Sequence, residues 1–587
     1  MHHERRTSAG SIIGRAYLTL LAAAFLSRVA ASLCGVAAGI VVGQGLGTAQ
    51  LGSLSVFDPV SRVQATLEVA ISTGAAYLCF YYQGLGERKR SDAVFTLACL
   101  LEVVLGVIFM VVFGPLARPI AELLGASGEA ARMAAGYVNG WALGCIPAML
   151  QSFFTTYLVL DGAKGRAVAS ALTLSIANVV LAWVSLRIFA GTPSDTFGVG
   201  FANTIAYFLA LAVCLPHFLG SRCSARLRRP RDVRRETAEI LKRGSAQGFN
   251  RVGTVVFSAI KNGTLIATGG VAALAASGAV SHVRTLIFAF IQAASSTVGG
   301  VSSALCGERD EKGLRTLLKV AVRTQLLICL AVSAAVFCAA PVLVRVFGID
   351  DPQTAFVAEQ MMRIYAVSIL PDALYQLYLS LQCAMGRAAL SSGLSLGGTL
   401  VVSSPLMLLL SRAMGPVGTW AGIAVSSVAM LVVCAVMVLR AGKGLMSARA
   451  WLRIPEEWSG KGAQLALDLD GSADSRLQAA EELEAFCREQ GIETRQATAA
   501  QHVAEEAWAL IAARREQEGA AACIDFRMLA QPEGLTIRLR YPGKPYDPLT
   551  DPDAAQGLEA KLLAHFASTR DYRFQMDVNN LVFTIAP

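Results

Sequence analysis

Acidic side chains that lie inside long apolar stretches are the residues of this sequence that could do chemistry. Asp372 follows Pro371 within one such stretch, and Glu68 lies within another. A charge at membrane depth is costly unless it is paired or hydrated, so each is a candidate functional group. A carboxylate in a cavity of low dielectric can exchange a proton or ligate Na⁺. We therefore expect Asp372 and Glu68 to bind a coupling cation or a substrate.

Each of these assignments has a structural alternative. Asp372 is either a coupling site or one half of a structural ion pair, with Tyr375 and Gln376 as its expected neighbours. For these two neighbours, ordinary packing or hydrogen bonding between helices is the favoured interpretation. Glu68 either carries a proton or contacts a substrate, or it forms a fixed pair with an Arg on a neighbouring helix. The residue types alone leave these alternatives open.

Basic side chains also lie within apolar stretches, at Arg28, Arg62, Lys261 and Arg284. If they line a cavity, that cavity suits an anionic substrate, such as a lipid-linked sugar phosphate or an organic anion. If they pair with nearby carboxylates instead, the site is nearly neutral.

No other group of residues suggests chemistry. The 13 cysteines are scattered without CxxC spacing, and the sequence has no Ser/His/Asp arrangement and no metal-spaced cluster. We predict that the protein is not an enzyme. We also expect no metal site and no cofactor, apart from H⁺ or Na⁺ as a coupling ion.

The composition indicates where these charges lie. The chain has 587 residues, of which 54% are hydrophobic and only 16% are charged. Soluble domains contain about 25% charged residues, so these values exclude an ordinary soluble enzyme and indicate a polytopic membrane protein. Residues 455–587 carry 13 Lys and Arg against 22 Asp and Glu, which leaves +18 on the first 454 residues. A basic membrane region reflects the positive-inside bias and anionic lipid, and we expect no nucleic-acid partner.

Apolar runs of about 20 residues, the length that crosses a bilayer, define the elements that must position the charges. We predict about twelve membrane helices, over residues 16–43, 54–82, 93–114, 133–160, 167–190, 197–219, 246–268, 274–304, 316–345, 359–384, 390–411 and 417–439. Basic residues gather in the loops after the second, sixth and twelfth of these spans, and the positive-inside rule places such loops in the cytoplasm. We therefore expect a multi-pass protein of the plasma membrane with both termini in the cytoplasm.

Six spans on either side of one long basic segment predict two lobes of six helices each. The expected domains are an N-lobe (1–221), a basic cytoplasmic linker (222–245), a C-lobe (246–440), a second linker (441–462) and a soluble domain (463–587). The membrane part is expected to be all-α.

The two lobes share sequence patterns. The Val-Ser pair at 60–61 recurs at 280–281, and Gly-Glu-Arg at 86–88 recurs at 307–309. Repeats of this kind indicate duplication and a cavity between the two copies, an architecture that is typical of transporters.

Residues 39–95 resemble the first two helices of the MATE (multidrug and toxic-compound extrusion) family, over GIVVGQGLGTAQLGSLSVFDPVSRVQATLEVAISTGAAYLCFYYQGLGERKRSDAVF. Residues 275–318 are similar to the corresponding part of the second lobe, and the resemblance covers about residues 15–440. It implies antiport by alternating access, with efflux of amphipathic and often cationic small molecules driven by H⁺ or Na⁺. It also implies that Asp372 matches the acid of the family's C-lobe cation site.

Several positions depart from the family pattern. Many members carry Asn and Asp on the first helix, but alignment on Gly43 puts Gly35 and Ala38 there, so that proton site is absent. The seventh helix offers Arg251 and Lys261 where other members place an acid. A second function therefore stays open, namely a flippase or exporter of a lipid-linked or anionic substrate.

The C-terminal region has the composition and length of one soluble domain. Its patterns predict strands at 464–470, 522–529, 535–541, 572–577 and 581–585, and helices at 473–490, 499–517 and 555–568. These elements predict an α+β sandwich in which helices pack on one sheet.

This domain resembles the histidine-kinase-like ATPase fold in its anti-sigma-factor kinase form. The resemblance is carried by HVAEEAWALI at 502–511, by IRLRYPGKPYDPL at 537–549 and by the C-terminal NNLVFTI. It implies a nucleotide site that contains Glu506, Gly543 and Asp547.

Two positions argue against an active nucleotide site. The Mg²⁺-binding Asn of that fold falls on Leu510, and its adenine-binding Asp falls on Tyr541. Leu offers no oxygen to a hard cation, and Tyr is a poor replacement for the carboxylate. We expect a degenerate regulatory domain that does not hydrolyse ATP, and that either binds a nucleotide weakly or docks a protein partner. A membrane sensor with a nucleotide-binding tail is a third possible function.

Overall fold

The computed structural model describes most of the chain. The described residues are 9–46, 58–123, 128–189, 195–220, 223–230, 232–347, 349, 351–440, 448–454, 464–470, 472–520, 522–531, 534–551, 554–575 and 578–586. They form two compact units, a helical one within 21–453 and one that contains the C-terminal region from 454 onward together with residues 9–20, the start of the first helix.

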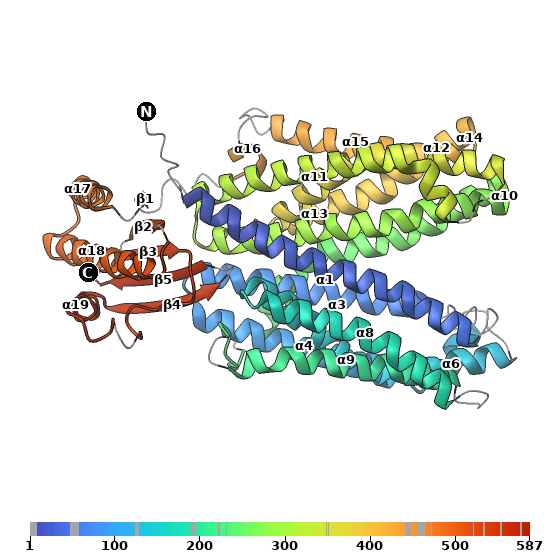
Figure 1. Ribbon diagram of the computed structural model, residues 1–587, viewed down its shortest axis with the longest axis horizontal. Helices are drawn as coiled ribbons and strands as arrows, with labels where there is room; N and C mark the ends of the chain where they lie inside the picture. The colour runs from blue at the N-terminus through green and yellow to red at the C-terminus, as the bar shows by residue number, and fades with distance from the viewer. Residues whose placement is uncertain are drawn as a thin grey trace. The chain divides into compact units, whose positions relative to one another are not determined.

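The helical unit has two halves, which form two layers in Figure 1. The first half contains α1 (Ala9–Leu46), α3 (Asp58–Gly84), α4 (Arg88–Phe113), α5 (Ala117–Leu123), α6 (Gly128–Ala142), α7 (Cys145–Leu160), α8 (Lys164–Ile188) and α9 (Asp195–Leu219). The second half contains α10 (Val233–Gly307), α11 (Glu311–Val346), α12 (Pro352–Ala384), α13 (Ala388–Leu396), the π-helix η1 (Gly397–Ser403), α14 (Ser404–Met414), α15 (Pro416–Arg440) and α16 (Ala448–Leu452).

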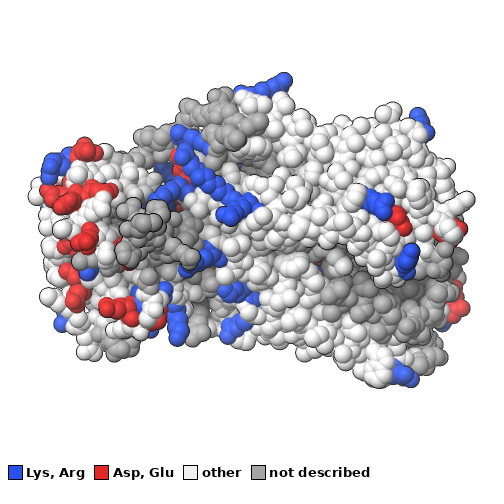
Figure 2. Space-filling model, turned by 45° about the horizontal axis from the view of Figure 1, so that its top comes forward, with Lys and Arg blue, Asp and Glu red and all other residues white. Residues whose placement is uncertain are grey.

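The described helices confirm a multi-span membrane protein. Ten helical segments are long and apolar enough to cross a membrane, and the bent pair of α6 and α7 raises the number to eleven. Figure 2 shows the surface that this composition produces: a broad face of the helical unit is uncharged, and Lys and Arg gather toward its margins. Such a band fits the hydrocarbon layer, where an exposed charge is costly.

The fourth predicted span, 133–160, is a bent pair of helices rather than one continuous helix. The segments Ala131–Ala142 and Cys145–Leu160 meet at a bend of 52°. Pro147 explains the break, because it has no N–H to donate and its ring clashes with the carbonyl group four residues earlier. The bend therefore lies just before the proline.

The predicted spans 246–268 and 274–304 both carry the label α10, which covers two helices that meet at a kink between the two predicted spans. Its backbone is interrupted only at Gly270, whose φ of 62° and ψ of −156° are not helical. The part of α10 after this glycine is among the candidate spans found in the described residues, whereas 246–268 is not. The basic linker predicted at 222–245 is also helical from Val233 onward.

Close contact between α3 and α10 joins the two halves. A Cβ atom on Gly244 would lie 1.7 Å from the carbonyl oxygen of Ala70, and one on Gly74 would lie 2.0 Å from that of Ile240. A Cβ atom on Gly84 would lie 2.2 Å from the carbonyl oxygen of residue 304. These distances are too short for any side chain, so the glycines allow the two backbones to touch.

The C-terminal region folds as a sheet covered by helices. Its elements are β1 (Gln464–Leu469), α17 (Ala473–Glu489), α18 (Thr494–Gln517), β2 (Ile524–Gln531), β3 (Gly534–Tyr541), α19 (Leu558–Phe566), β4 (Thr569–Gln575) and β5 (Val578–Ile585). All neighbouring strands are antiparallel, in the order β1-β2-β3-β5-β4. The predicted strands and helices of this region are confirmed, with boundaries that differ by a few residues.

Apolar residues at every second position of β3 contribute to the core of this domain. Leu535, Ile537 and Leu539 are buried, and helix α18 packs against the sheet through Trp508, whose ring meets that of Phe526 edge to face at 5.0 Å. The predicted α+β arrangement of helices on one sheet is therefore observed.

A glycine substitution tests the contact between α3 and α10. Gly244→Ala places a methyl group against the backbone of α3, and overpacking of this kind costs about 1–3 kcal/mol. We expect a lower melting temperature for the purified full-length protein. The matched control is Gly263→Ala on the same helix, where a Cβ atom would meet nothing within 4 Å. It should leave the melting temperature unchanged or raise it, because Ala favours helix. Equal melting temperatures for the two variants would contradict the packing described here.

Candidate functional site

A cavity of about 750 Å³ lies between the two halves of the helical unit. Its wall comes from α1, α3, α6, α7 and α9 of the first half and from α10 of the second. Nine of its 23 lining residues are Ser or Thr, and Trp141, Ala148 and Phe288 are among the apolar ones. The volume and the mixed lining fit a binding site for a small organic molecule.

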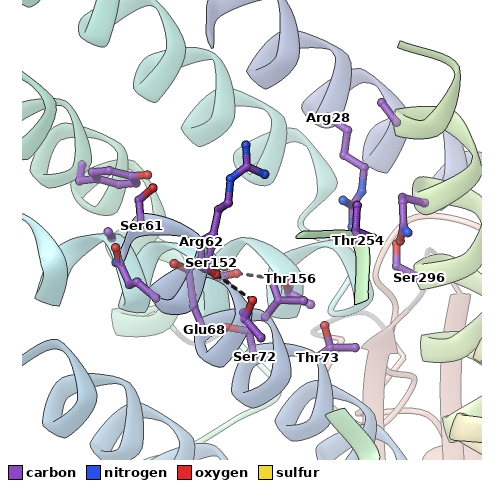
Figure 3. Close-up of a pocket in the computed structure, with 18 of the residues that line it drawn as sticks. Arg28, Ser61, Arg62, Glu68, Ser72, Thr73, Ser152, Thr156, Thr254 and Ser296 are labelled. Carbon is purple, nitrogen blue, oxygen red and sulfur yellow. Dashed lines mark hydrogen bonds between the residues drawn. The ribbon is translucent and has the colours of Figure 1, made fainter. Parts of the chain in front are cut away.

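Helix α3 supplies the largest share of the polar wall. Ser61, Glu68 and Ser72 recur at seven- and four-residue intervals, so they lie along one face of the helix. Figure 3 shows this row together with Arg62, and it shows the side chain of Ser152 on α7 close by. Regular helical spacing thus converts a run of small polar residues into a continuous polar surface.

Three of the predicted site residues line this cavity, namely Arg28, Arg62 and Glu68. Arg28 reaches the cavity from α1, and the other two lie on α3. The cavity wall described here therefore carries two guanidinium groups and one carboxylate. The remaining predicted residues do not line this cavity.

Asp372 lies in a second polar cluster, in the second half of the unit. Its carboxylate accepts a hydrogen bond from Gln376, and the charge of Arg284 acts on it. Arg284 itself lies 5.6 Å from the ring centroid of Phe288, and the latter residue belongs to the cavity wall. The expected neighbour Gln376 is thus beside Asp372, and a basic group is near it.

Lys261 and Tyr375 lie around the same cluster but have other contacts. The Nζ atom of Lys261 donates to the hydroxyl of Ser281 at 3.1 Å and lies 5.2 Å from the ring centroid of Trp420. The hydroxyl of Tyr375 donates to the backbone carbonyl of Leu394 at 2.7 Å, which links two helices. The predicted basic residues are therefore divided between two places, two in the cavity and two in this cluster.

Glu102 is a buried acid that the sequence analysis missed. It lies on α4, is 0% exposed, and its Oε1 atom accepts a hydrogen bond from the hydroxyl of Ser72 at 2.7 Å. The signal was in the sequence, since Glu102 is the only acidic residue between Asp92 and Glu122. It falls in the middle of the predicted span 93–114, where a charge is as costly as at Glu68.

A second missed cluster joins Asp161, His217 and Cys223, whose potential metal-ligand atoms lie within 4.8 Å of one another. The three residues are far apart in sequence, which left no spacing to recognise. Asp161 Oδ2 lies 2.7 Å from His217 Nε2, and the hydroxyl and backbone N–H of Ser224 also donate to this carboxylate. Because hydrogen bonds already satisfy Asp161, the cluster fits a tether for the segment after α9 rather than a metal site.

Loss of the histidine should loosen this segment. The backbone N–H groups of Arg226 and Arg228 donate to side chains of α4, and Arg226 and Arg228 are exposed. We expect His217→Leu to speed tryptic cleavage after these two arginines about tenfold, which corresponds to about 1.4 kcal/mol of easier local opening. The measurement is limited proteolysis of the purified protein, with His282→Leu at an exposed histidine as control. Equal cleavage rates would show that the tether does not hold the segment.

The three predicted nucleotide-site residues of the C-terminal domain occupy different surroundings. Glu506 lies on α18, and burial and the Glu559 carboxylate raise its pKa. Asp547 Oδ1 accepts from the backbone N–H of Leu549 at 3.1 Å, and Gly543 has a φ of +130°. A groove described on this domain is lined by other residues, mainly of α18 and the segments around 470 and 520.

Leu510 and Tyr541, which occupy the positions of the Mg²⁺-binding Asn and the adenine-binding Asp in the family resemblance, have structural contacts. Tyr541 is buried and its hydroxyl donates to the backbone carbonyl of Tyr546 at 2.6 Å, and Leu510 packs against the domain core. Both side chains therefore stabilise the fold at positions where the family resemblance would require a ligand for adenine or Mg²⁺.

Comparison with solved structures identifies the fold of the helical unit. A mutant of the Vibrio cholerae MATE transporter VcmN matches with a TM-score of 0.68 at 15% identity, over 77% of this chain and 99% of that one. An outward-facing multidrug-resistance transporter of the MATE family matches with a TM-score of 0.67 at 20% identity, over 73% and 97%. A MATE protein in complex with MaL6 gives 0.66 at 20% identity, over 73% and 95%. No curated protein matches the chain.

A family model adds evidence from the sequence itself. The MatE model matches twice, over residues 23–184 and 248–409, and the two matches together cover more than half of the chain. Two matches to one model confirm the predicted internal repeat, and both fall in the helical part. The chain therefore belongs to the MatE family, and it is a membrane transporter rather than an enzyme.

Proposed function

We propose that this protein is a cation-coupled antiporter that exports amphipathic organic molecules, many of them cationic, and that the 750 Å³ cavity is its substrate site. The observation that carries the proposal is this cavity, which is lined by both halves of a MatE fold and has a carboxylate, Glu68, on its wall. Its hydroxyl and amide groups offer adaptable hydrogen bonds, and its aromatic and alkyl side chains accept an apolar body. The gradient that drives export is one of H⁺ or Na⁺.

The contact between α3 and α10 suits a gate in this cycle. Gly84 and Gly307 lie just before the loops that carry Glu87, Arg88 and Glu308, Arg309, and the basic loops favour the cytoplasmic side. In this proposal the touching backbones close the cavity toward the cytoplasm. Transport then requires the two halves to separate there and to approach each other on the opposite side.

Asp372 is proposed as the coupling residue of the second half. Gln376 donates to it, and Arg284 and Lys261 lie in the same cluster, so gain or loss of a cation at this carboxylate changes the charge balance between α10 and α12. Such a change favours one arrangement of the halves over the other if the two arrangements bury Asp372 differently. Tyr375 serves helix packing in this proposal.

A second candidate function follows from the two arginines of the cavity. Arg28 and Arg62 line it together with a single acidic residue, Glu68, so the described wall is net positive. A positive wall favours an anionic or lipid-linked substrate. A flippase or exporter of such a molecule is therefore the alternative to cation efflux.

The remaining parts of the chain receive roles that support this function. We propose twelve spans, six in each lobe, with the part of α10 before Gly270 completing the second lobe and with both termini in the cytoplasm. The domain at 463–587 is proposed as a degenerate kinase-like regulatory domain that docks a protein partner. Its five-stranded sheet with packed helices supports the fold. Leu510 and Tyr541, at the positions expected to bind Mg²⁺ and adenine, support the loss of nucleotide hydrolysis.

Efflux of a fluorescent lipophilic cation tests the leading proposal. We expect vesicles that contain the full-length protein to export the dye when a proton or sodium gradient is applied and to stop when the gradient is collapsed. Asp372→Asn and Glu68→Gln should reduce efflux to the level of empty vesicles, because each removes a carboxylate that binds the coupling ion or the dye.

Glu122→Gln is the matched control, since Glu122 is exposed and pairs with Arg118 on α5. This variant should transport at the wild-type rate. Absence of dye efflux from folded, inserted wild-type protein under either gradient would overturn the cation-export proposal. Transport of a fluorescent anionic lipid in the same vesicles would then support the alternative.

A further inference from the structure

Glu102 is placed where an ionised carboxylate is hard to maintain. It lies near the middle of α4, about 21 Å along the helix from Arg88 at 1.5 Å per residue, and it is 0% exposed. Its Oε1 atom accepts from Ser72, whereas its Oε2 atom is buried and has no hydrogen-bond partner among the described residues. A buried charge of this kind needs a cation or a proton for compensation.

The groups that face Glu102 supply no cation in the part of the chain that the structure describes. Helix α3 presents Ser72 and the carboxylate of Glu68, which acts on Glu102 as a like charge. On α4 itself the nearest titratable group is Cys99. Glu68 also acts on Cys145 of α7 and on Tyr207 of α9, and it shares the cavity wall with Arg28 and Arg62. The one charge that acts on buried Glu102 is thus that of another carboxylate, and two interacting carboxylates favour a state in which they share one proton.

The pair reaches the cavity through one side chain. Glu68 and Ser72 both line the cavity, and the Ser72 hydroxyl bonds directly to Glu102 behind the wall. A hydroxyl both donates and accepts, so it can pass a proton between cavity water and the carboxyl group.

We propose that Glu102 is a buried proton-binding residue of the first half, which exchanges its proton with the cavity through Ser72 and is coupled to the cavity-facing Glu68. This inference rests on the proposed antiport function and names the residues that carry its proton. A cationic molecule beside Glu68 compensates the negative charge of the pair, and the shared proton then leaves through Ser72 to the cavity. Departure of the cation restores the proton, so one positive charge replaces the other.

Infrared spectroscopy of the reconstituted full-length protein tests the site directly, because a protonated carboxyl group has a C=O band distinct from that of a carboxylate. At neutral pH we expect a protonated-carboxyl band that decreases when tetraphenylphosphonium, a lipophilic cation, is added. Glu102→Gln should lose this band, by the amplitude of one carboxyl group per chain. An unchanged band in the folded Glu102→Gln protein would overturn the proposal.

Two further variants keep the test decisive. Ser72→Ala removes the hydrogen bond and keeps the carboxyl group, so it should shift the band without abolishing it. If Glu102→Gln does not fold, an unshifted band in Ser72→Ala would overturn the proposal instead. Glu122→Gln, at an exposed ion pair on α5, should match the wild-type spectrum.

The result is separable from the dye-efflux experiment. A cation-sensitive band at Glu102 in a protein that exports no cationic dye would sustain the proton site and overturn the proposed cation export. Dye efflux driven by a proton gradient, in a protein whose band is the same with and without Glu102, would sustain the proposed cation export and overturn the proton site at Glu102.

Discussion

The distance between the two halves of this transporter is set by backbone contact between α3 and α10. Glycines at 74, 84 and 244 remove the side chains that would otherwise separate these helices. The cavity wall depends on this contact, because Glu68 and Ser72 project from α3 while Thr254 and Ser296 project from α10. A change in how the two helices meet therefore changes the binding surface as well as access to it.

The helices and strands could be predicted from the sequence, because hydrophobic patterns and the residues that end helices and strands act locally. Ten or eleven spans, the internal repeat and nearly all elements of the C-terminal domain follow from runs of apolar residues, from alternation and from turn residues. The break before Pro147 was also readable in principle, since proline acts on its own helix. The boundary between the predicted spans 246–268 and 274–304 was readable as well, because Gly270 between them adopts a non-helical conformation that separates the two helices labelled α10.

The composition of the site was harder to predict, since it depends on which helix faces meet. Arg28, Arg62, Lys261 and Arg284 are equivalent in sequence, as basic residues in apolar runs, yet the fold divides them between the cavity and the cluster around Asp372. Glu102, like Glu68, is an acidic residue within an apolar run. Its link to the cavity comes from a hydrogen bond with Ser72, which lies 30 residues earlier in the chain, on α3. The cluster at Asp161 depends on three segments and has no local signal.

Tyr77 has a consequence for how the halves separate. This fully buried residue of α3 places its hydroxyl 3.3 Å from both the backbone oxygen of Ser296 on α10 and the hydroxyl of Ser380 on α12. One side chain thus links the first half to two helices of the second, and neither link can stretch far before it breaks. Separation of the halves at this point therefore has to break two hydrogen bonds of one side chain, so the position of α3 is tied to α12 as well as to α10.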